Sequence, residues 1–155
     1  MYKRILLPME NERDQEPALA QARKLAQSTG ATVVLAWLVP VVATEEYFLK
    51  QMQIEPGSSG ARRKARGEVF LQQAAGALRD AGVDVTLLLE VTPLAPEQAI
   101  LDLAEKHGID LILMATLPQS AVGRFLLGSV AEKVRRRSPV PVLFIQAPET
   151  AAAMR

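Results

Sequence analysis

Short apolar runs alternate along the chain with longer amphipathic stretches. Five of these runs predict buried strands, over residues 4–9, 31–40, 83–91, 109–115 and 140–146. The intervening stretches carry apolar residues at helical spacing and predict helices over residues 14–30, 62–80, 95–108 and 129–137. Runs such as LILMA and VLFI are apolar throughout, which is typical of strands covered by helices on two sides. The pattern therefore predicts an α/β fold, a doubly wound, five-stranded parallel sheet with helices on both faces.

The same pattern indicates how the chain is organised. At 155 residues the chain is most simply one domain, which we expect over residues 1–148. At about residues 41–62 the periodicity dissolves into glycine, serine and charged residues, so we expect a mobile loop there. The last residues, 149–155, are expected to form a frayed tail.

Composition narrows the function classes. The chain is 49% hydrophobic and 23% charged with a net charge of +1, so nothing in its overall charge favours nucleic acid or an anionic membrane as a partner. It has no cysteine, which excludes disulfides, thiolate metal sites and a cysteine nucleophile. The apolar run before Pro8 is too short for a signal peptide, so we expect a cytoplasmic protein.

The segment after the fourth predicted strand is the unusual connection. It runs from about Thr116 to Leu127, roughly twice the length of most strand-to-helix loops. It ends in Gly128 and Ser129 at the start of a predicted helix, where free N–H groups and the helix dipole favour an anion. Ser129 either contacts a phosphate or caps the helix, and Arg124 in the loop could add a cation.

From these residues the chain resembles the universal stress protein family. The resemblance rests on MYKRILLPME, GATVVLAWLVP, APEQAILDLAEKHGIDLILMA and above all SAVGRFLLGSVAEKVRRRSPVPVLFIQ, and it covers nearly the whole chain. It implies a Rossmann-like fold of the adenine nucleotide alpha hydrolase type with strand order 3-2-1-4-5. It also implies a homodimer through the last strand, Val140 to Ile145, and an adenine nucleotide as ligand.

The chain departs from the motif of the ATP-binding branch of that family, Gly-x2-Gly-x9-Gly-Ser/Thr. The first two glycines fall on Ala115 and Pro118, while the closing pair is kept as Gly128 and Ser129. Pro118 has no N–H to donate and fixes its φ, so a run of N–H donors around a polyphosphate cannot pass through it. The family's aspartate after the first strand becomes Glu10, which keeps the charge but is one methylene longer.

The resemblance carries a set of candidate site residues onto this chain. The second strand is included because the family often places adenine against its end. The candidates are Pro8, Met9, Glu10, Leu38, Met114, Ala115, Thr116, Pro118, Arg124, Gly128, Ser129 and Val130.

Two functions are compatible with these residues. In the first, the protein is a dimeric binding or signalling module of the stress response that has lost or weakened ordinary ATP binding. In the alternative, it binds ATP or AMP, with or without magnesium, through an altered loop and hydrolyses ATP weakly. We favour a binding protein over an enzyme, since no catalytic set of residues stands at the predicted strand ends. His107 and the arginines of VRRRS lie at helix ends, where the helix dipole accounts for them, and Trp37 is expected in the core.

Overall fold

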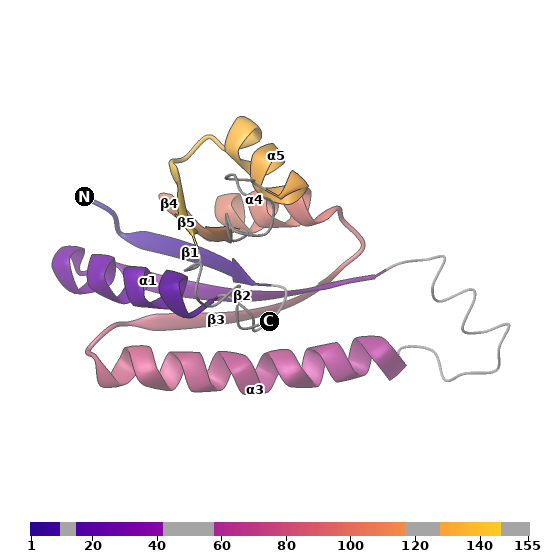
Figure 1. Ribbon diagram of the computed structural model, residues 1–155, viewed down its shortest axis with the longest axis horizontal. Helices are drawn as coiled ribbons and strands as arrows, with labels where there is room; N and C mark the ends of the chain where they lie inside the picture. Colours follow the sequence, from indigo (N-terminus) through magenta and orange to yellow (C-terminus); the bar gives the residue numbers. More distant parts are fainter. Residues whose placement is uncertain (10–14, 42–57, 117–127, 147–155) are drawn as a thin grey trace, which may run out of the picture.

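The computed structural model describes residues 1–9, 15–41, 58–116 and 128–146 (Figure 1). The described elements, in chain order, are β1 (Arg4–Met9), α1 (Glu16–Thr29), β2 (Thr32–Pro40), α3 (Ser58–Asp80), β3 (Val85–Thr92), α4 (Pro96–Lys106), β4 (Leu111–Thr116), α5 (Ser129–Arg137) and β5 (Val142–Gln146). Every described element corresponds to one that the sequence pattern predicts. The largest difference is in α3, which begins at Ser58 rather than near Arg62 and so takes up the end of the expected loop.

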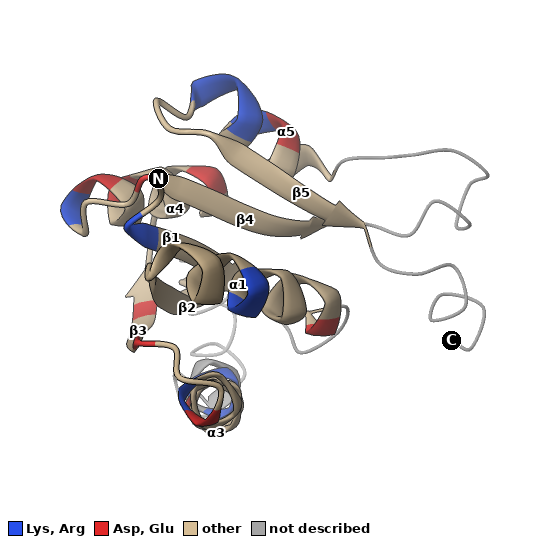
Figure 2. Cartoon of the chain, turned by 90° about the vertical axis from the view of Figure 1, so that its left-hand side faces the viewer, with Lys and Arg blue, Asp and Glu red and all other residues tan. Residues whose placement is uncertain are grey.

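The five strands form one parallel sheet in the order β3-β2-β1-β4-β5, which confirms the predicted fold class and strand order. Helices α1 and α3 cover one face, and α4 and α5 cover the other (Figures 1 and 2). Alternate residues of each strand enter two separate cores, as Leu7 does on the α1 side and Leu6 on the α4 side. Both are fully buried, which explains why the strands are apolar throughout.

The junction between β1 and β4 is short. β1 pairs with β2 along its whole length, but with β4 only through Ile5–Leu111 and Leu6–Ile112. The amino ends of the two strands are fastened by Asp110, whose carboxylate accepts hydrogen bonds from the backbone N–H groups of Lys3 at 2.7 Å and Arg4 at 3.0 Å. The two halves of the sheet are therefore joined at the amino edge, and their pairing stops before the carboxyl edge.

Helix α3 packs closely against the sheet at a glycine, Gly67. Trp37 on β2 is buried, as expected, and its ring lies 5.7 Å from that of Phe70. A Cβ atom built on Gly67 would lie 2.4 Å from Cδ1 of Trp37, well inside van der Waals contact. Gly67 thus leaves the space that the indole ring fills.

Helices α4 and α5 are joined by an ion pair. Glu97 in the first turn of α4 is buried, and its carboxylate lies 3.5 Å from Nζ of Lys133 on α5. A hydrogen bond from its own backbone N–H, together with the charge of Lys133, lowers the pKa of Glu97 despite the opposing effect of burial. The negative charge also suits the N-terminus of a helix.

The close contact at Gly67 yields a test with a control in the same helix. We expect Gly67→Ala to lower the free energy of unfolding by about 1–3 kcal/mol, because the new methyl group displaces Trp37. Gly76→Ala adds a methyl group where no heavy atom lies within 4 Å, so it should raise stability by up to about 1 kcal/mol through helix propensity. Urea denaturation of both variants measures the difference, and equal effects would contradict the packing described.

The ion pair yields a prediction of pH dependence. Because the pKa of Glu97 is lowered on folding, its contribution to stability is present above the ordinary value of 4.5 and is lost as pH falls through the folded pKa. We expect Glu97→Gln to be less stable than the wild type at pH 7, and the gap to close toward pH 3. Urea midpoints across this range measure it. Glu68→Gln, an exposed change on α3, is the control and should leave the midpoints unchanged.

Candidate functional site

The carboxyl edge of the sheet gathers most of the predicted site residues. Because all strands are parallel, the ends of β1, β2 and β4 lie at one edge, and α5 begins there after β4 (Figure 1). The described candidates at this edge are Pro8, Met9, Leu38, Met114, Ala115, Thr116, Gly128, Ser129 and Val130. Glu10, Pro118 and Arg124 lie outside the described residues. The edge is also where β1 and β4 are no longer paired, which is the position of ligand crevices in doubly wound sheets.

The ends of β1 and β4 contribute mainly apolar groups. Met9 and Met114 are buried, and they belong to opposite faces of the sheet. The side chain of Thr116 is also buried, and its hydroxyl donates a hydrogen bond of 3.4 Å to the carbonyl of Ile145 on β5. The described ends of these two strands therefore present no charged side chain, and a charged ligand would have to be bound by other groups at this edge.

The N-terminus of α5 supplies that polar element. The first helical bond runs from Glu132 N–H to the carbonyl of Gly128 at 3.0 Å, so the N–H groups of Ser129, Val130 and Ala131 have no partner within the helix. Gly128 is the N-cap residue, and among the described residues no side chain caps the helix. Ser129 is thus the first helical residue and is exposed, so its interpretation as the capping residue is wrong.

Gly128 also leaves room beside this terminus. Its φ of −61° is open to any residue, so the backbone conformation does not require glycine. A Cβ atom there would meet no heavy atom of the described residues within 4 Å. Uncapped N–H groups with open space beside them and a helix dipole behind them can bind a small anion.

The lysine of α5 forms an ion pair with a residue of another helix. Lys133, one turn along from Ser129, pairs with Glu97. Arg135, Arg136 and Arg137 lie in the last turn, at the C-terminal end of α5 (Figure 2). Backbone N–H groups are therefore the main source of positive potential that the described residues offer at the crevice.

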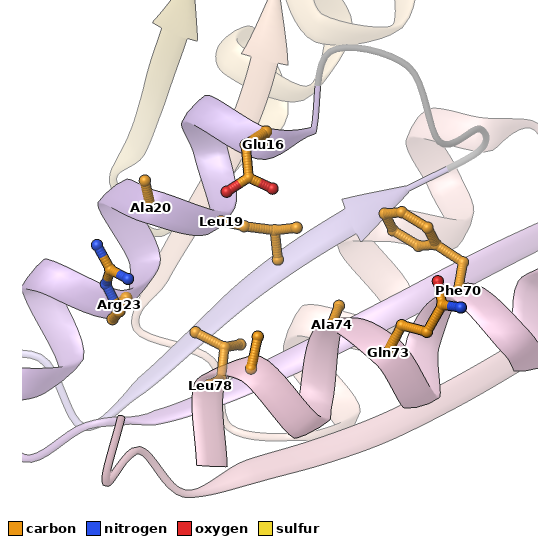
Figure 3. A pocket seen from close by; sticks show the side chains of 9 residues that line it. Glu16, Leu19, Ala20, Arg23, Phe70, Gln73, Ala74 and Leu78 are labelled. Carbon is orange, nitrogen blue, oxygen red and sulfur yellow. The ribbon is translucent and has the colours of Figure 1, made fainter. Parts of the chain in front are cut away.

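A second hollow lies on the other face of the sheet. It has a volume of about 230 Å³ between α1 and α3, with Leu19, Phe70 and Leu78 toward its interior and Glu16 and Arg23 along α1 (Figure 3). None of the predicted site residues line it. It is a gap between two helices and stands apart from the crevice.

The described residues contain neither a cluster of metal ligands nor a helix that could span a membrane. In the part of the chain that the structure describes, no group of three or more histidine, aspartate or glutamate side chains could hold a metal ion. No helix there is long and apolar enough to cross a membrane. His107 follows the end of α4, and its carbonyl accepts a hydrogen bond of 2.6 Å from Nε of Arg4.

Two of the solved structures with this fold contain an adenine nucleotide. One is a universal stress protein from Archaeoglobus fulgidus in complex with dAMP, with a TM-score of 0.62 and 20% identity over 93% of this chain and 98% of that chain. The other is a universal stress protein in complex with cAMP, with a TM-score of 0.64 and 23% identity over 94% of this chain and 97% of that chain. At these identities the likeness shows the fold.

Comparison of the sequence gives the family. A universal stress protein of Methanocaldococcus jannaschii is 29% identical over 153 residues, covering 96% of this chain and 85% of the relative. A solved structure from the same family, from Burkholderia pseudomallei, has a TM-score of 0.74 and 24% identity over 93% of this chain and 96% of that chain. The model of the universal stress protein family matches residues 1–146, and the chain belongs to that family.

Proposed function

We propose that this protein is a dimeric binding module of the stress response that holds an adenine nucleotide by one phosphate. The proposal rests on the N-terminus of α5, which no described side chain caps and where no described atom lies within 4 Å of a Cβ on Gly128, together with the absence of pairing between the carboxyl ends of β1 and β4. One phosphate is the size of anion that a single helix N-terminus binds through its free N–H groups.

The sequence of the loop before α5 disfavours tight binding of a triphosphate. Ala115 and Pro118 stand where the ATP-binding pattern has glycines. A proline has no N–H, so the β- and γ-phosphates lose a backbone donor that a glycine would supply. The dAMP and cAMP held by the two relatives each carry one phosphate, which supports a monophosphate as the ligand class.

Calorimetric titration with AMP and with ATP in the presence of magnesium tests this proposal. We expect AMP to bind and ATP to bind no more tightly, because the extra phosphates find few donors. ATP binding tighter than AMP by about tenfold or more, equivalent to about 1.4 kcal/mol, would contradict it and favour the alternative of an ATP-binding and weakly hydrolysing protein. The double change Ala115→Gly with Pro118→Gly should raise the affinity for ATP relative to AMP.

Substitution of the N-cap residue separates binding from folding. We expect Gly128→Asp to abolish AMP binding, because a carboxylate occupies the N–H groups and repels the phosphate. The same variant should unfold at an equal or higher urea concentration, because aspartate is a good N-cap. Gly128→Ala is the control, since it neither caps nor repels, and it should retain measurable binding.

The dimer is proposed on the strand β5. In the described sheet it is an edge strand, with one side unpaired. Its side chains are apolar but not fully buried: Leu143 is 37% exposed, and Val142, Phe144 and Ile145 are partly buried. An apolar edge strand of this kind pairs readily with another chain. We propose that Val140 to Ile145 forms the interface with a second copy.

Sedimentation at tens of micromolar tests the interface. We expect a dimer for the wild type and a monomer for Leu143→Lys, because a charge on the edge strand opposes pairing. Val69→Lys, a change at an exposed apolar residue on α3, should remain dimeric. A monomeric wild type would exclude the dimer.

A further inference from the structure

The hollow between α1 and α3 lies apart from the crevice and is lined mainly by apolar side chains. Leu19 of α1 and Phe70 and Leu78 of α3 point toward the gap between the two helices (Figure 3). Its volume of about 230 Å³ is below the usual range of small-molecule pockets, roughly 300–1,000 Å³. A hollow of this size and lining suits one apolar side chain of a docking protein segment.

An exposed apolar residue, Val69, extends this surface along α3. Val69 is 59% exposed, and Gln73, one turn further along the same helix, lines the hollow. Gln73 and Ala77 are also exposed, so this side of α3 is open to solvent in the described structure. A single exposed valine is ordinary, but a valine beside an apolar hollow enlarges the surface that a partner can bury.

The described start of α3 is strongly basic. Four cations stand within five positions, at Arg62, Arg63, Lys64 and Arg66, and the first turn of the helix has no acidic residue. None of these four side chains is buried, and from residue 62 onward the first buried position is Gly67. Cations near the N-terminus of a helix oppose its dipole and destabilise it. Their concentration here therefore favours a partner that brings negative charge.

The basic end of α3 and the hollow lie along one side of the helix. Spacings of four, seven and four residues place the following positions on that side: Arg62, Arg66, Gln73 and Ala77. The last two of these residues line the hollow. A segment that binds in the hollow and extends along α3 toward its start therefore meets the cations.

A cation also lines the hollow from α1. Arg23 is exposed and lies two turns along α1 from Glu16, which is the one acid among the described lining residues. Since α1 and α3 both run from the carboxyl edge of the sheet toward the amino edge, Arg23 lies toward the Leu78 end of the groove (Figure 3). From Arg66 to Leu78 the helix rises about 18 Å. The groove thus has an apolar middle and a cation toward each end.

This arrangement distinguishes among anionic partners. A nucleic acid presents a continuous row of phosphates, whereas the cations here are separated by an apolar stretch of about 18 Å. An amphipathic helix presents a stripe of apolar side chains with acidic residues beside it, and such helices bind in apolar grooves. The groove therefore matches an acidic amphipathic helix in both shape and charge.

We propose that the groove between α1 and α3 binds an acidic amphipathic helix of a partner protein. The helix inserts an apolar side chain into the hollow, and it places acidic residues near Arg62 and Arg66 at one end and near Arg23 at the other. At 1.5 Å per residue, these acidic positions are about three to four turns apart on the partner helix. The inference goes beyond the proposed function and depends neither on a nucleotide nor on the dimer through β5.

Fluorescence anisotropy with two labelled peptides of about 20 residues tests the proposal. One peptide repeats leucine at helical spacing with glutamate at the flanking positions, and the other has lysine in place of each glutamate. We expect the full-length protein to bind the acidic peptide at least about tenfold more tightly than the basic peptide, because the cations of the groove attract one and repel the other.

Four variants locate the binding surface. Ala77→Phe should weaken binding of the acidic peptide by about tenfold or more, because the new ring fills the hollow from an exposed position. Gln72→Phe, an exposed change on another side of α3, is its control and should bind like the wild type. Arg62→Glu should also weaken binding, whereas Lys64→Glu, the same change of charge on another side of the helix, should not. Both charge variants should unfold at an equal or higher urea concentration, because an acidic residue suits the start of a helix.

Several outcomes would contradict the proposal. Equal binding of the two peptides, or binding of neither, would overturn it, and so would an Ala77→Phe or Arg62→Glu variant that binds the acidic peptide like the wild type. Loss of the dimer in Ala77→Phe, measured by sedimentation, would assign the groove to a second copy of the chain. Tighter binding of a thymidine oligonucleotide than of the acidic peptide would assign the basic end of α3 to nucleic acid. Either of these assignments would overturn the partner helix.

Discussion

The pairing of β1 with β4 is the constraint on which the rest of the structure depends. It joins strands from opposite halves of the chain, yet it runs through two residue pairs next to the amino edge. Asp110 reinforces that edge by binding the backbone of Lys3 and Arg4. The two halves are joined there and are not paired toward the carboxyl edge, which is the position at which doubly wound sheets place their ligands.

The architecture could be predicted from the sequence because strand periodicity and the family resemblance both act over long segments. The details that depend on contacts between distant parts of the chain could not be predicted from the sequence. Gly67 looks like an ordinary helix-weakening residue until the indole of Trp37 is placed against it. Glu97 reads in the sequence as an ordinary acid in the first turn of a helix, and only the packing of α5 shows that it is buried and paired with Lys133. The cations at the start of α3 are visible in the sequence, but only the structure shows that α1 forms an apolar hollow with the same helix.

Two helix starts share a physical property. In α5 no described side chain caps the first N–H groups, and in α3 cations stand near the start of the helix, where the helix dipole favours anions. Both features cost stability in the free protein, and both are local departures from the rules that govern the rest of the chain. Such departures are expected at functional sites, because a group that is satisfied within the protein has nothing left to offer a ligand.

A ligand bound at the carboxyl edge would join the two halves of the sheet where β1 and β4 are not paired. β4 pairs with β5 along five residues, from Ile112–Val142 to Thr116–Gln146, so a change at the end of β4 is carried directly to the edge strand. On the proposed function, the crevice and the dimer interface are thus two sides of the same pair of strands. If both parts of the proposed function hold, a ligand that binds one arrangement of these strands more tightly would shift the population toward it and so link occupancy of the site to association, without any catalytic step.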